Sequence, residues 1–340
     1  MKTLSLVNQK GGCGKTITAV NLAAGLTKKG FRVLLIDLDP QAHATFALRK
    51  ESSVYITDIL EAISRNEELS WDQVYTPVTD NFYLIPSRIG LASLEHKLAS
   101  REDKLLMLSY FLSKISSNFD YCLIDCPPNL GILTLNALAA SQYSLVPLTI
   151  CDFSLRGIEI LKNILIMLKE FKGSHPVPFY LLTQVDKRLN FSWQFMEKVK
   201  KQLGSLLLST TIRTNVYLRE AASTGKTIFA YKPDSRGAED FIALTEEIVK
   251  ITSLSNWTSL FLKGEKFSEI YVVGDFNNWR KDERYKLNKV AEDIWSINIP
   301  LEKGKYRYKF LEGNTWFSDP HNTLAEDDAF GGKNSLLLID

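Results

Sequence analysis

The sequence contains few cysteines, and their spacing matches no metal site. The four are Cys13, Cys122, Cys126 and Cys151, and they lack the paired spacing that zinc ligands need. Cys122 and Cys126 lie on an apolar stretch, where a cysteine is most simply a core residue. A chain without a disulfide pattern suits a reducing compartment, so we expect a cytoplasmic protein.

Long apolar runs are missing as well. No stretch approaches the ~20 apolar residues that span a bilayer. The N-terminus starts in a short strand pattern and has neither the apolar core nor the cleavage site of a signal peptide. The C-terminus shows no amphipathic helix of the kind that binds membrane surfaces. We therefore expect no membrane among the partners.

The overall charge is low but unevenly distributed. The formal net charge is +2, yet residues 186–236 carry ten basic and four acidic side chains. Residues 256–340 carry twelve basic and fourteen acidic side chains. A local basic face is what sequence-independent binding of nucleic-acid phosphates requires. The alternative is a solvated helix face, which accounts for most charge runs.

The first three quarters of the 340 residues alternate between strand and helix patterns. Strands are expected at 3–7, 32–37, 82–85, 121–125, 144–148, 178–183 and 227–230. Helices are expected at 15–29, 91–117, 130–141, 154–172, 191–204 and 236–252. Such alternation predicts an α/β domain in which helices cover both faces of a mostly parallel sheet.

A glycine-rich motif, Lys-Gly-Gly-Cys-Gly-Lys-Thr, occupies residues 10–16, between a strand pattern and a helical pattern. In this place backbone N–H groups can surround a phosphate, and the helix N-terminus adds a favourable dipole. We expect Lys15 to reach the β- and γ-phosphates of a nucleotide and the Thr16 hydroxyl to bind Mg²⁺. The nucleotide-binding residues are then Gly11, Gly12, Cys13, Gly14, Lys15, Thr16 and Ile17.

The motif departs from the usual phosphate-binding loop because it has a lysine at its start and no glycine at positions 8 or 9. In this respect it resembles the deviant Walker A loop of the ParA/MinD/Soj family of ATPases. The resemblance implies ATP and Mg²⁺ as cofactors, ATP hydrolysis, and an ATP-dependent homodimer in which Lys10 contacts the partner's nucleotide. The family often has threonine where Ile17 stands, so only the backbone N–H of Ile17 remains for the α-phosphate.

Two strand patterns end in aspartates. One ends in Asp37-Leu-Asp39-Pro-Gln and the other in Asp125-Cys-Pro-Pro. Carboxylates at the carboxyl ends of parallel strands lie where open α/β sheets bind ligands, although such aspartates also cap strands or start loops. Both segments resemble the same ATPase family. The resemblance implies that Asp39 positions the attacking water, that Asp125 holds Mg²⁺ and that Asp37 lies near the metal, with Lys10, Lys15 and Asp39 as the catalytic set.

The resemblance to ParA/Soj extends over about residues 1–252. It implies non-specific DNA binding through Arg188, Arg213 and Arg219, partitioning of plasmid or chromosomal DNA, and a ParB-like partner that stimulates hydrolysis. It also implies association with the nucleoid in the ATP-bound state. The family commonly has proline at the position of Arg213 and a basic residue at the position of Tyr217. No base-reading helix-turn-helix segment is present, so any DNA contact is expected to ignore sequence.

The pattern changes after about residue 254. We expect a connector at 255–259 and a second domain over 253–340, rich in aromatic residues, turns and period-2 strands. The strands are expected at 270–273, 295–299, 305–310 and 336–339. Several short strands in about 85 residues predict a small all-β, immunoglobulin-like sandwich.

Four positions of this second domain, Trp279, Lys309, Trp316 and Asn334, stand in segments that resemble the family-48 carbohydrate-binding module. That module occurs in the beta subunit of AMP-activated protein kinase, and the resemblance implies that these four residues bind α-glucan such as glycogen. Indole faces stack on pyranose rings, while amide and ammonium groups bond to hydroxyls. The family's leucine and threonine are replaced here by Phe330 and Gly332. The alternative is a face that docks a protein.

Three functions remain open from the sequence. The first is a ParA-type ATPase that partitions DNA. The second is the same ATPase positioning another cargo, which the sandwich holds. The third is a nucleotide-gated glycogen sensor or adaptor without a DNA role. The basic window at 186–236 favours the first two, and the pair Trp279 and Trp316 favours the last two.

Overall fold

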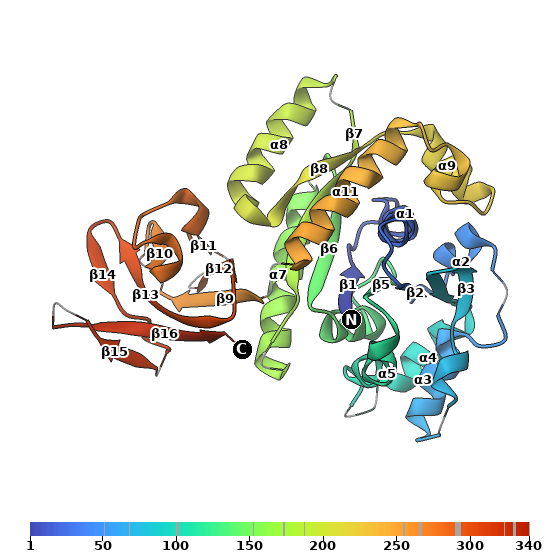
Figure 1. Cartoon of the computed structure of the whole chain (residues 1–340), viewed down its shortest axis with the longest axis horizontal. Coiled ribbons are helices and arrows are strands. Elements are labelled where there is room, and N and C mark those ends of the chain that lie inside the picture. Colours follow the sequence, from blue (N-terminus) through green and yellow to red (C-terminus); the bar gives the residue numbers. More distant parts are fainter. Residues whose placement is uncertain are drawn as a thin grey trace. The chain divides into compact units, whose positions relative to one another are not determined.

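The computed structural model describes the chain except for residues 51, 68, 100, 102, 152, 173, 187, 254–255, 265–266, 290–293, 323, 329–330 and 340. The chain divides into two compact units (Figure 1). The first comprises Met1–Val199 and Leu207–Val249, and the second comprises Lys200–Leu206 and Lys250–Asp340. The predicted domain boundary after residue 252 stays a prediction.

The first unit contains an eight-stranded sheet in the order β3-β4-β2-β5-β1-β6-β7-β8. Its strands are β1 (Lys2–Leu6), β2 (Val33–Asp37), β3 (Thr76–Thr79), β4 (Phe82–Ile85), β5 (Tyr121–Asp125), β6 (Tyr143–Thr149), β7 (Val177–Val185) and β8 (Leu207–Arg213). All neighbouring pairs are parallel except β3 and β4. The mostly parallel α/β fold predicted from the sequence is confirmed.

Helices pack on both faces of this sheet (Figure 1). They are α1 (Lys15–Lys28), α2 (His43–Leu48), α3 (Ile56–Ser64), α4 (Gly90–Leu98), α5 (Met107–Ile115), α6 (Ile132–Ala140), α7 (Phe153–Lys172), α8 (Asn190–Leu203), α9 (Val216–Ser223), α10 (Ile228–Tyr231) and α11 (Arg236–Ser253). Strands β1, β2 and β5 are buried almost throughout, as strands covered on both faces must be. In the described ranges, no helix combines the length and the apolar character that a bilayer crossing needs.

Two elements of the first unit differ from the sequence prediction. The segment 227–230, predicted as a strand, belongs to helix α10, and the last strand of the sheet is β8. The N–H of Ile228 donates to the side chain of Asn21 on α1 at 2.7 Å, so it is committed to a helix start rather than to a sheet ladder. The single helix predicted at 91–117 is two helices, α4 and α5. The sequence prediction also missed β3, β8, α2, α3 and α9.

The second unit consists mainly of β-strands, although it also contains the ends of α8 and α11. One sheet has the order β10-β13-β16-β15 with β14 paired to β13, and the other has the order β11-β12-β9. The strands are β9 (Asn256–Lys263), β10 (Ile270–Gly274), β11 (Asn288–Lys289), β12 (Ile294–Leu301), β13 (Gly304–Glu312), β14 (Thr315–Phe317), β15 (Ala325–Asp327) and β16 (Lys333–Ile339).

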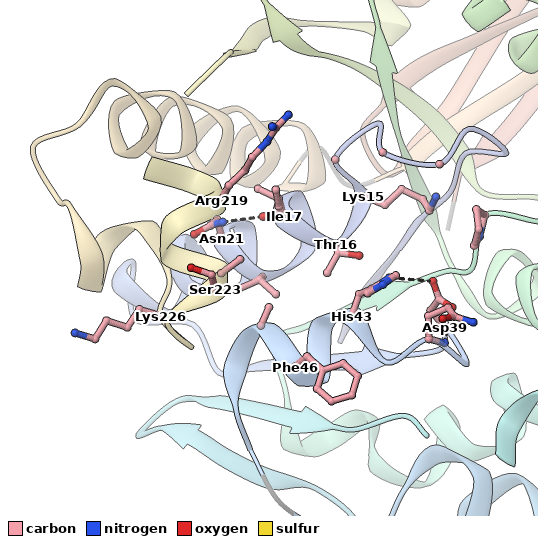
Figure 2. Close-up of a pocket in the computed structure, with 18 of the residues that line it drawn as sticks. Lys15, Thr16, Ile17, Asn21, Asp39, His43, Phe46, Arg219, Ser223 and Lys226 are labelled. Carbon is pink, nitrogen blue, oxygen red and sulfur yellow. Dashed lines mark hydrogen bonds and ion pairs between the residues drawn. The ribbon is translucent and has the colours of Figure 1, made fainter. Parts of the chain in front are cut away.

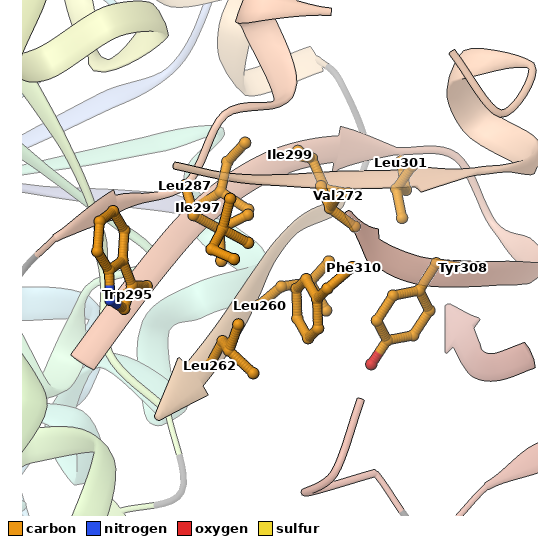
Figure 3. Packing of buried hydrophobic residues seen from close by; sticks show 11 residues of the cluster. Leu260, Leu262, Val272, Leu287, Trp295, Ile297, Ile299, Leu301, Tyr308 and Phe310 are labelled. Carbon is orange, nitrogen blue, oxygen red and sulfur yellow. The ribbon is translucent and has the colours of Figure 1, made fainter. Parts of the chain in front are cut away.

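The two sheets of this unit share one apolar core, which makes the unit a sandwich (Figure 3). Leu260 and Ile297 come from the three-stranded sheet, and Val272, Tyr308 and Phe310 come from the five-stranded sheet. The connector predicted at 255–259 is wrong, because β9 begins at Asn256 and pairs with β12 along its whole length. Residue 255 lies outside the described residues.

Candidate functional site

The predicted nucleotide residues meet at one edge of the first unit's sheet. Strands β2, β5 and β1 are neighbours, and Asp37 pairs in register with Asp125 at their carboxyl ends. The glycine-rich loop 10–16 follows β1, which lies between β5 and β6 in the sheet. This edge is where open α/β sheets bind ligands, and the topology brings together motifs that lie more than 100 residues apart in the chain.

The glycine-rich loop turns back on itself at two glycines. Gly12 has φ 71° and Gly14 has φ 91°, in the left-handed region that L side chains rarely adopt. The loop leads into α1, where Lys15 is only 7% exposed. Its Nζ donates to the backbone carbonyl of Asn8 at 3.0 Å, so the ammonium group folds back over the loop. This is the position from which a lysine can meet a phosphate inside the loop.

A hydroxyl–carboxylate pair lies beside the loop. The Thr16 hydroxyl donates to Asp125 Oδ2 at 2.7 Å. The other oxygen of Asp125 is buried and has no hydrogen-bond partner. Burial, helped by the nearby charge of Asp37, raises the pKa of Asp125 well above its usual value. A buried, unsatisfied carboxylate oxygen next to a threonine hydroxyl is the donor set that a hard divalent cation prefers.

The other two carboxylates are held by local hydrogen bonds. Asp37 Oδ2 accepts from both the backbone N–H and the hydroxyl of Thr45, at 2.8 Å each. Asp37 Oδ1 accepts from the backbone N–H of Asp39 at 3.1 Å. Burial, with a contribution from Asp39, raises the pKa of Asp37 to about 6. Asp39 accepts from the N–H of Gln41 at 2.9 Å and lies 3.9 Å from His43 Nδ1.

A cavity of about 740 Å³ is lined by three glycines of the loop and by Lys15, Thr16 and Asp39 (Figure 2). Lys15, Thr16 and Asp39 point into it from the sheet edge, while Arg219 and Ser223 of α9 border it on the other side. Phe46 lies on its wall and is 71% exposed. The volume and this mixture of backbone, charged and apolar walls suit a nucleotide.

Lys10 points toward its own chain. Its Nζ contacts Thr149 Oγ1 at 2.8 Å and Cys151 Sγ at 3.1 Å, at the end of β6. Partial burial raises the pKa of the Cys151 thiol, but hydrogen bonds with Ser154, Lys10 and Thr149 outweigh it and lower that pKa to about 7. Lys10 therefore has partners within its own chain, and its predicted contact across a dimer stays a prediction.

The three arginines predicted to contact DNA have different surroundings. Arg188 pairs with Asp186 at 2.6 Å and is 88% exposed. Arg213 is held by Asp240 and Glu239, at 2.7 and 2.9 Å. Arg219 borders the nucleotide cavity. Their role in DNA binding stays a prediction, and Arg213 is the least available of the three because two carboxylates engage its guanidinium group.

The four predicted sugar-binding residues lie on the outer face of the five-stranded sheet. The rings of Trp279 and Trp316 stack with centroids 6.3 Å apart and planes 26° apart. Trp279 packs on the cluster of Tyr271, Val273 and Leu311, and Leu311 pairs with Trp316 across β13 and β14. Tyr308 pairs with Ser335, so the next residues along, Lys309 and Asn334, lie opposite each other on β13 and β16.

The aromatic and polar residues of this face differ in how far they are exposed to solvent. Trp316 is 45% exposed, while Asn334 is 8% exposed. The ammonium group of Lys309 pairs with Asp328, and both side chains are largely buried. Residue 330, one of the departures from the carbohydrate-module pattern, lies outside the described residues. The face therefore offers an indole surface backed by an ion pair.

Comparison with known proteins decides the family. Residues 1–174 match the AAA domain family, and residues 261–340 match the glycogen recognition site of AMP-activated protein kinase. The sporulation initiation inhibitor protein Soj of Bacillus subtilis is 37% identical over 248 residues, which cover 73% of this chain and 98% of Soj. The chain belongs to the ParA/Soj family of ATPases. The chromosome partitioning protein ParA of Myxococcus xanthus is 35% identical, over 73% of this chain and 88% of that protein.

Solved structures share the fold of this ParA/Soj domain. Apo McdA of Cyanothece superposes with a TM-score of 0.65 at 23% identity, over 73% of this chain and 99% of McdA. Cobyrinic acid a,c-diamide synthase of Mycobacterium smegmatis, with bound ADP and magnesium, gives a TM-score of 0.63 at 27% identity, over 73% of this chain and 94% of the synthase. The first likeness supports the fold alone.

Family membership confirms three of the predictions made from the sequence. The protein is an ATP hydrolase, its cofactors are ATP and Mg²⁺, and a domain that matches the glycogen recognition site of AMP-activated protein kinase follows the ATPase domain. The residues present fit the metal, because Asp125 keeps one buried oxygen without a partner and its other oxygen is bonded to the Thr16 hydroxyl, and oxygen ligands of this kind suit Mg²⁺. No group of three or more His, Cys, Asp or Glu residues in the described ranges forms a metal site by itself. Phosphate and water must therefore complete the shell around Mg²⁺, which keeps waters readily.

Sequence reasoning missed several residues of the site. Thr45 fixes Asp37, Thr149 and Cys151 hold Lys10, and Gln184 donates to the phosphate loop. None of these residues belongs to a nucleotide motif. Thr45 lies eight residues after Asp37, whereas only the strand order brings Thr149, Cys151 and Gln184 to the loop. A search for polar residues at the ends of β6 and β7 would have found Thr149 and Gln184.

Proposed function

We propose that this protein is a ParA-type ATPase that dimerises on ATP, binds DNA without regard to sequence, and hydrolyses ATP to partition DNA or to position another cargo. The observation that carries the proposal is the convergence of Lys15, Thr16 and Asp39 on one cavity. Asp125 is hydrogen-bonded to Thr16, and Lys10 lies in the loop that borders the cavity. Each of these residues stands in a segment resembling the family's motifs.

The geometry supports a distinct part for each residue. Lys15 and the N–H groups of the loop would hold the phosphates of ATP, and Thr16 and Asp125 would hold Mg²⁺, which stabilises the charge that develops on the phosphates. Asp39, which lines the same cavity, would position the attacking water. Asp37, braced by Thr45, would keep negative charge beside the metal. The backbone N–H of Ile17 would meet the α-phosphate.

Lys10 would act across the dimer interface. A lysine that reaches the partner's nucleotide ties dimerisation to ATP occupancy, because the phosphates supply the charge that it needs. In the proposed cycle the ATP-bound dimer binds DNA and so associates with the nucleoid. A ParB-like partner then stimulates hydrolysis and releases the protein. Arg219 supports a link between DNA and nucleotide, since it borders the ATP cavity.

Replacing Lys10 with alanine should leave nucleotide binding intact and weaken ATP-dependent dimerisation about tenfold or more, because a charge-assisted contact to phosphate is lost. Light scattering of the full chain with ATP measures the fraction of dimer. Binding of DNA of arbitrary sequence at low salt measures the effect of dimerisation on DNA affinity. Thr149→Val is the matched control, since it removes one of the two resting contacts of Lys10 and keeps the lysine. Normal dimerisation of Lys10→Ala would contradict the deviant-loop assignment.

The C-terminal sandwich is proposed to bind α-glucan. The observation behind this proposal is the indole pair of Trp279 and Trp316 on the outer sheet face, with Lys309 and Asn334 beside it. Two planes tilted by 26° offer a shallow angled surface, which suits pyranose rings that do not lie in one plane. The ion pair of Lys309 with Asp328 fixes the ammonium group at this face.

Trp279→Ala should reduce co-sedimentation of the protein with glycogen about tenfold, since losing ~1.4 kcal/mol of stacking changes affinity by that factor. Trp193→Ala is the control, because Trp193 is 52% exposed on the first unit and stands outside the sugar face. Equal co-sedimentation of parent and Trp279→Ala would refute the assignment. Running the assay with and without ATP tests whether nucleotide alters glucan binding.

A second candidate is a nucleotide-gated glycogen sensor or adaptor without a DNA role. It is favoured by the engagement of Arg213 and Arg188 with carboxylates, which leaves fewer free cations than the sequence suggested. Glycogen binding that depends on ATP, together with no salt-sensitive DNA binding, would select this candidate.

A further inference from the structure

Two side chains at the end of β7 hold carbonyl groups of the phosphate loop. Gln184 Nε2 donates to the carbonyl oxygen of Gly12 at 2.6 Å. Thr183 Oγ1 donates to the carbonyl oxygen of Cys13 at 2.8 Å. β7 lies two strands away from β1, beyond β6, and Gln184 lines the nucleotide cavity. Consecutive carbonyls of the loop are therefore bound by consecutive residues of another strand.

These contacts determine where the loop's N–H groups point. In a planar trans peptide the C=O and the N–H of the next residue point in opposite directions. Holding the Gly12 carbonyl therefore sets the N–H of Cys13, and holding the Cys13 carbonyl sets the N–H of Gly14. A phosphate loop works by turning such N–H groups toward phosphate oxygens. A carbonyl that turned inward would instead face the phosphate with its negative end.

The backbone of Gln184 is itself unusual. Its φ is 55°, in the left-handed region that a glutamine seldom adopts. Such a conformation persists only where its surroundings hold it, and it occurs often at ligand-binding sites. Here the strained residue is the one whose amide group binds the loop, and it bends the chain immediately after Thr183.

We infer that Gln184, backed by Thr183, is a positioning residue for nucleotide binding. The two side chains fix two successive peptide planes of the loop before ATP arrives, so that the N–H groups of Cys13 and Gly14 need no reorganisation when phosphate binds. The inference uses the ATP site and is independent of DNA and glucan.

The test measures dissociation constants of the full chain for ATP and ADP with Mg²⁺ by calorimetry, together with kcat and KM. Gln184→Met keeps the length of the side chain and removes the donor, and it should weaken both nucleotides about fivefold, the effect of one hydrogen bond. Because the loop is positioned before binding, KM should rise while kcat changes little. Lys15→Ala serves as the reference for a lost nucleotide site.

A second variant separates positioning from folding. Gln184→Gly also removes the amide group, but glycine adopts φ 55° without strain, so Tm should not fall. Nucleotide affinity should nevertheless drop about fivefold, as in Gln184→Met. A merely structural role would make affinity follow Tm.

A third pair tests the residue behind it. Thr183→Val should weaken binding of both nucleotides, whereas Thr183→Ser, which keeps the hydroxyl, should restore it. Parental affinity in Gln184→Met, or affinity that falls only together with Tm in Gln184→Gly, overturns the inference. If Lys15→Ala loses nucleotide binding while the β7 variants keep it, the ATP site is supported but Gln184 and Thr183 have no role in it.

Discussion

Replacing Lys15 with alanine should abolish detectable ATP turnover, with a loss of about 100-fold or more, the usual effect of removing one electrostatic stabiliser of a developing oxyanion. Lys15 is 7% exposed and lines the cavity. Its ammonium group donates a hydrogen bond to the carbonyl oxygen of Asn8, which holds it close to the loop. When ATP binds, the same group can turn from that carbonyl to the phosphates. Alanine leaves the phosphate charge without its nearest cation.

The measurement is equilibrium binding of a fluorescent ATP analogue, followed by phosphate release under saturating nucleotide. Lys28→Ala is the control, because Lys28 is the exposed lysine at the other end of the same helix. It should bind and hydrolyse ATP as the parent does. Turnover by Lys15→Ala within threefold of the parent would show that the nucleotide does not occupy this loop.

The ATP site was predictable because its signals are local. The loop 10–16, Asp37, Asp39 and Asp125 each follow a strand pattern directly, and parallel strands bring such strand ends to one edge of a sheet. The four sugar-face residues came from the resemblance to the carbohydrate-binding module, and their role stays a prediction. Trp279 lies outside every strand of the sheet, so strand periodicity alone does not place it beside Trp316.

Features that depend on tertiary partners were not predictable. The apolar run at 227–230 fits a strand as well as a helix, and the Asn21 side chain, 200 residues earlier in the chain, favours the helix start. The contact of Lys10 with Thr149 depends on β6 lying next to β1. Similarly, the sequence shows Arg213 as a free cation, and only the packing of α11 against β8 supplies Asp240 and Glu239.

Asp39→Ala should stop hydrolysis without preventing ATP binding, and so accumulate an ATP-bound dimer. The Asp39 carboxylate lines the cavity and accepts a hydrogen bond from the backbone N–H of Gln41. This bond orients the carboxylate and leaves it able to accept another from water. Removing a group that positions or activates the attacking water costs about 100-fold or more in rate. Binding should change little, because Lys15 and the loop remain.

Size-exclusion chromatography of the full chain with ATP, alongside phosphate release, checks this expectation. His43→Ala is the matched control, since His43 faces Asp39 at 3.9 Å but is largely exposed. If Asp39 acts on water directly, His43→Ala should keep most of the turnover. If both variants lose the same share of turnover, Asp39 and His43 would instead be needed together for the local structure. Rapid hydrolysis by Asp39→Ala would leave Asp37, which is braced by Thr45 and pairs with Asp125, as the carboxylate that remains to position water.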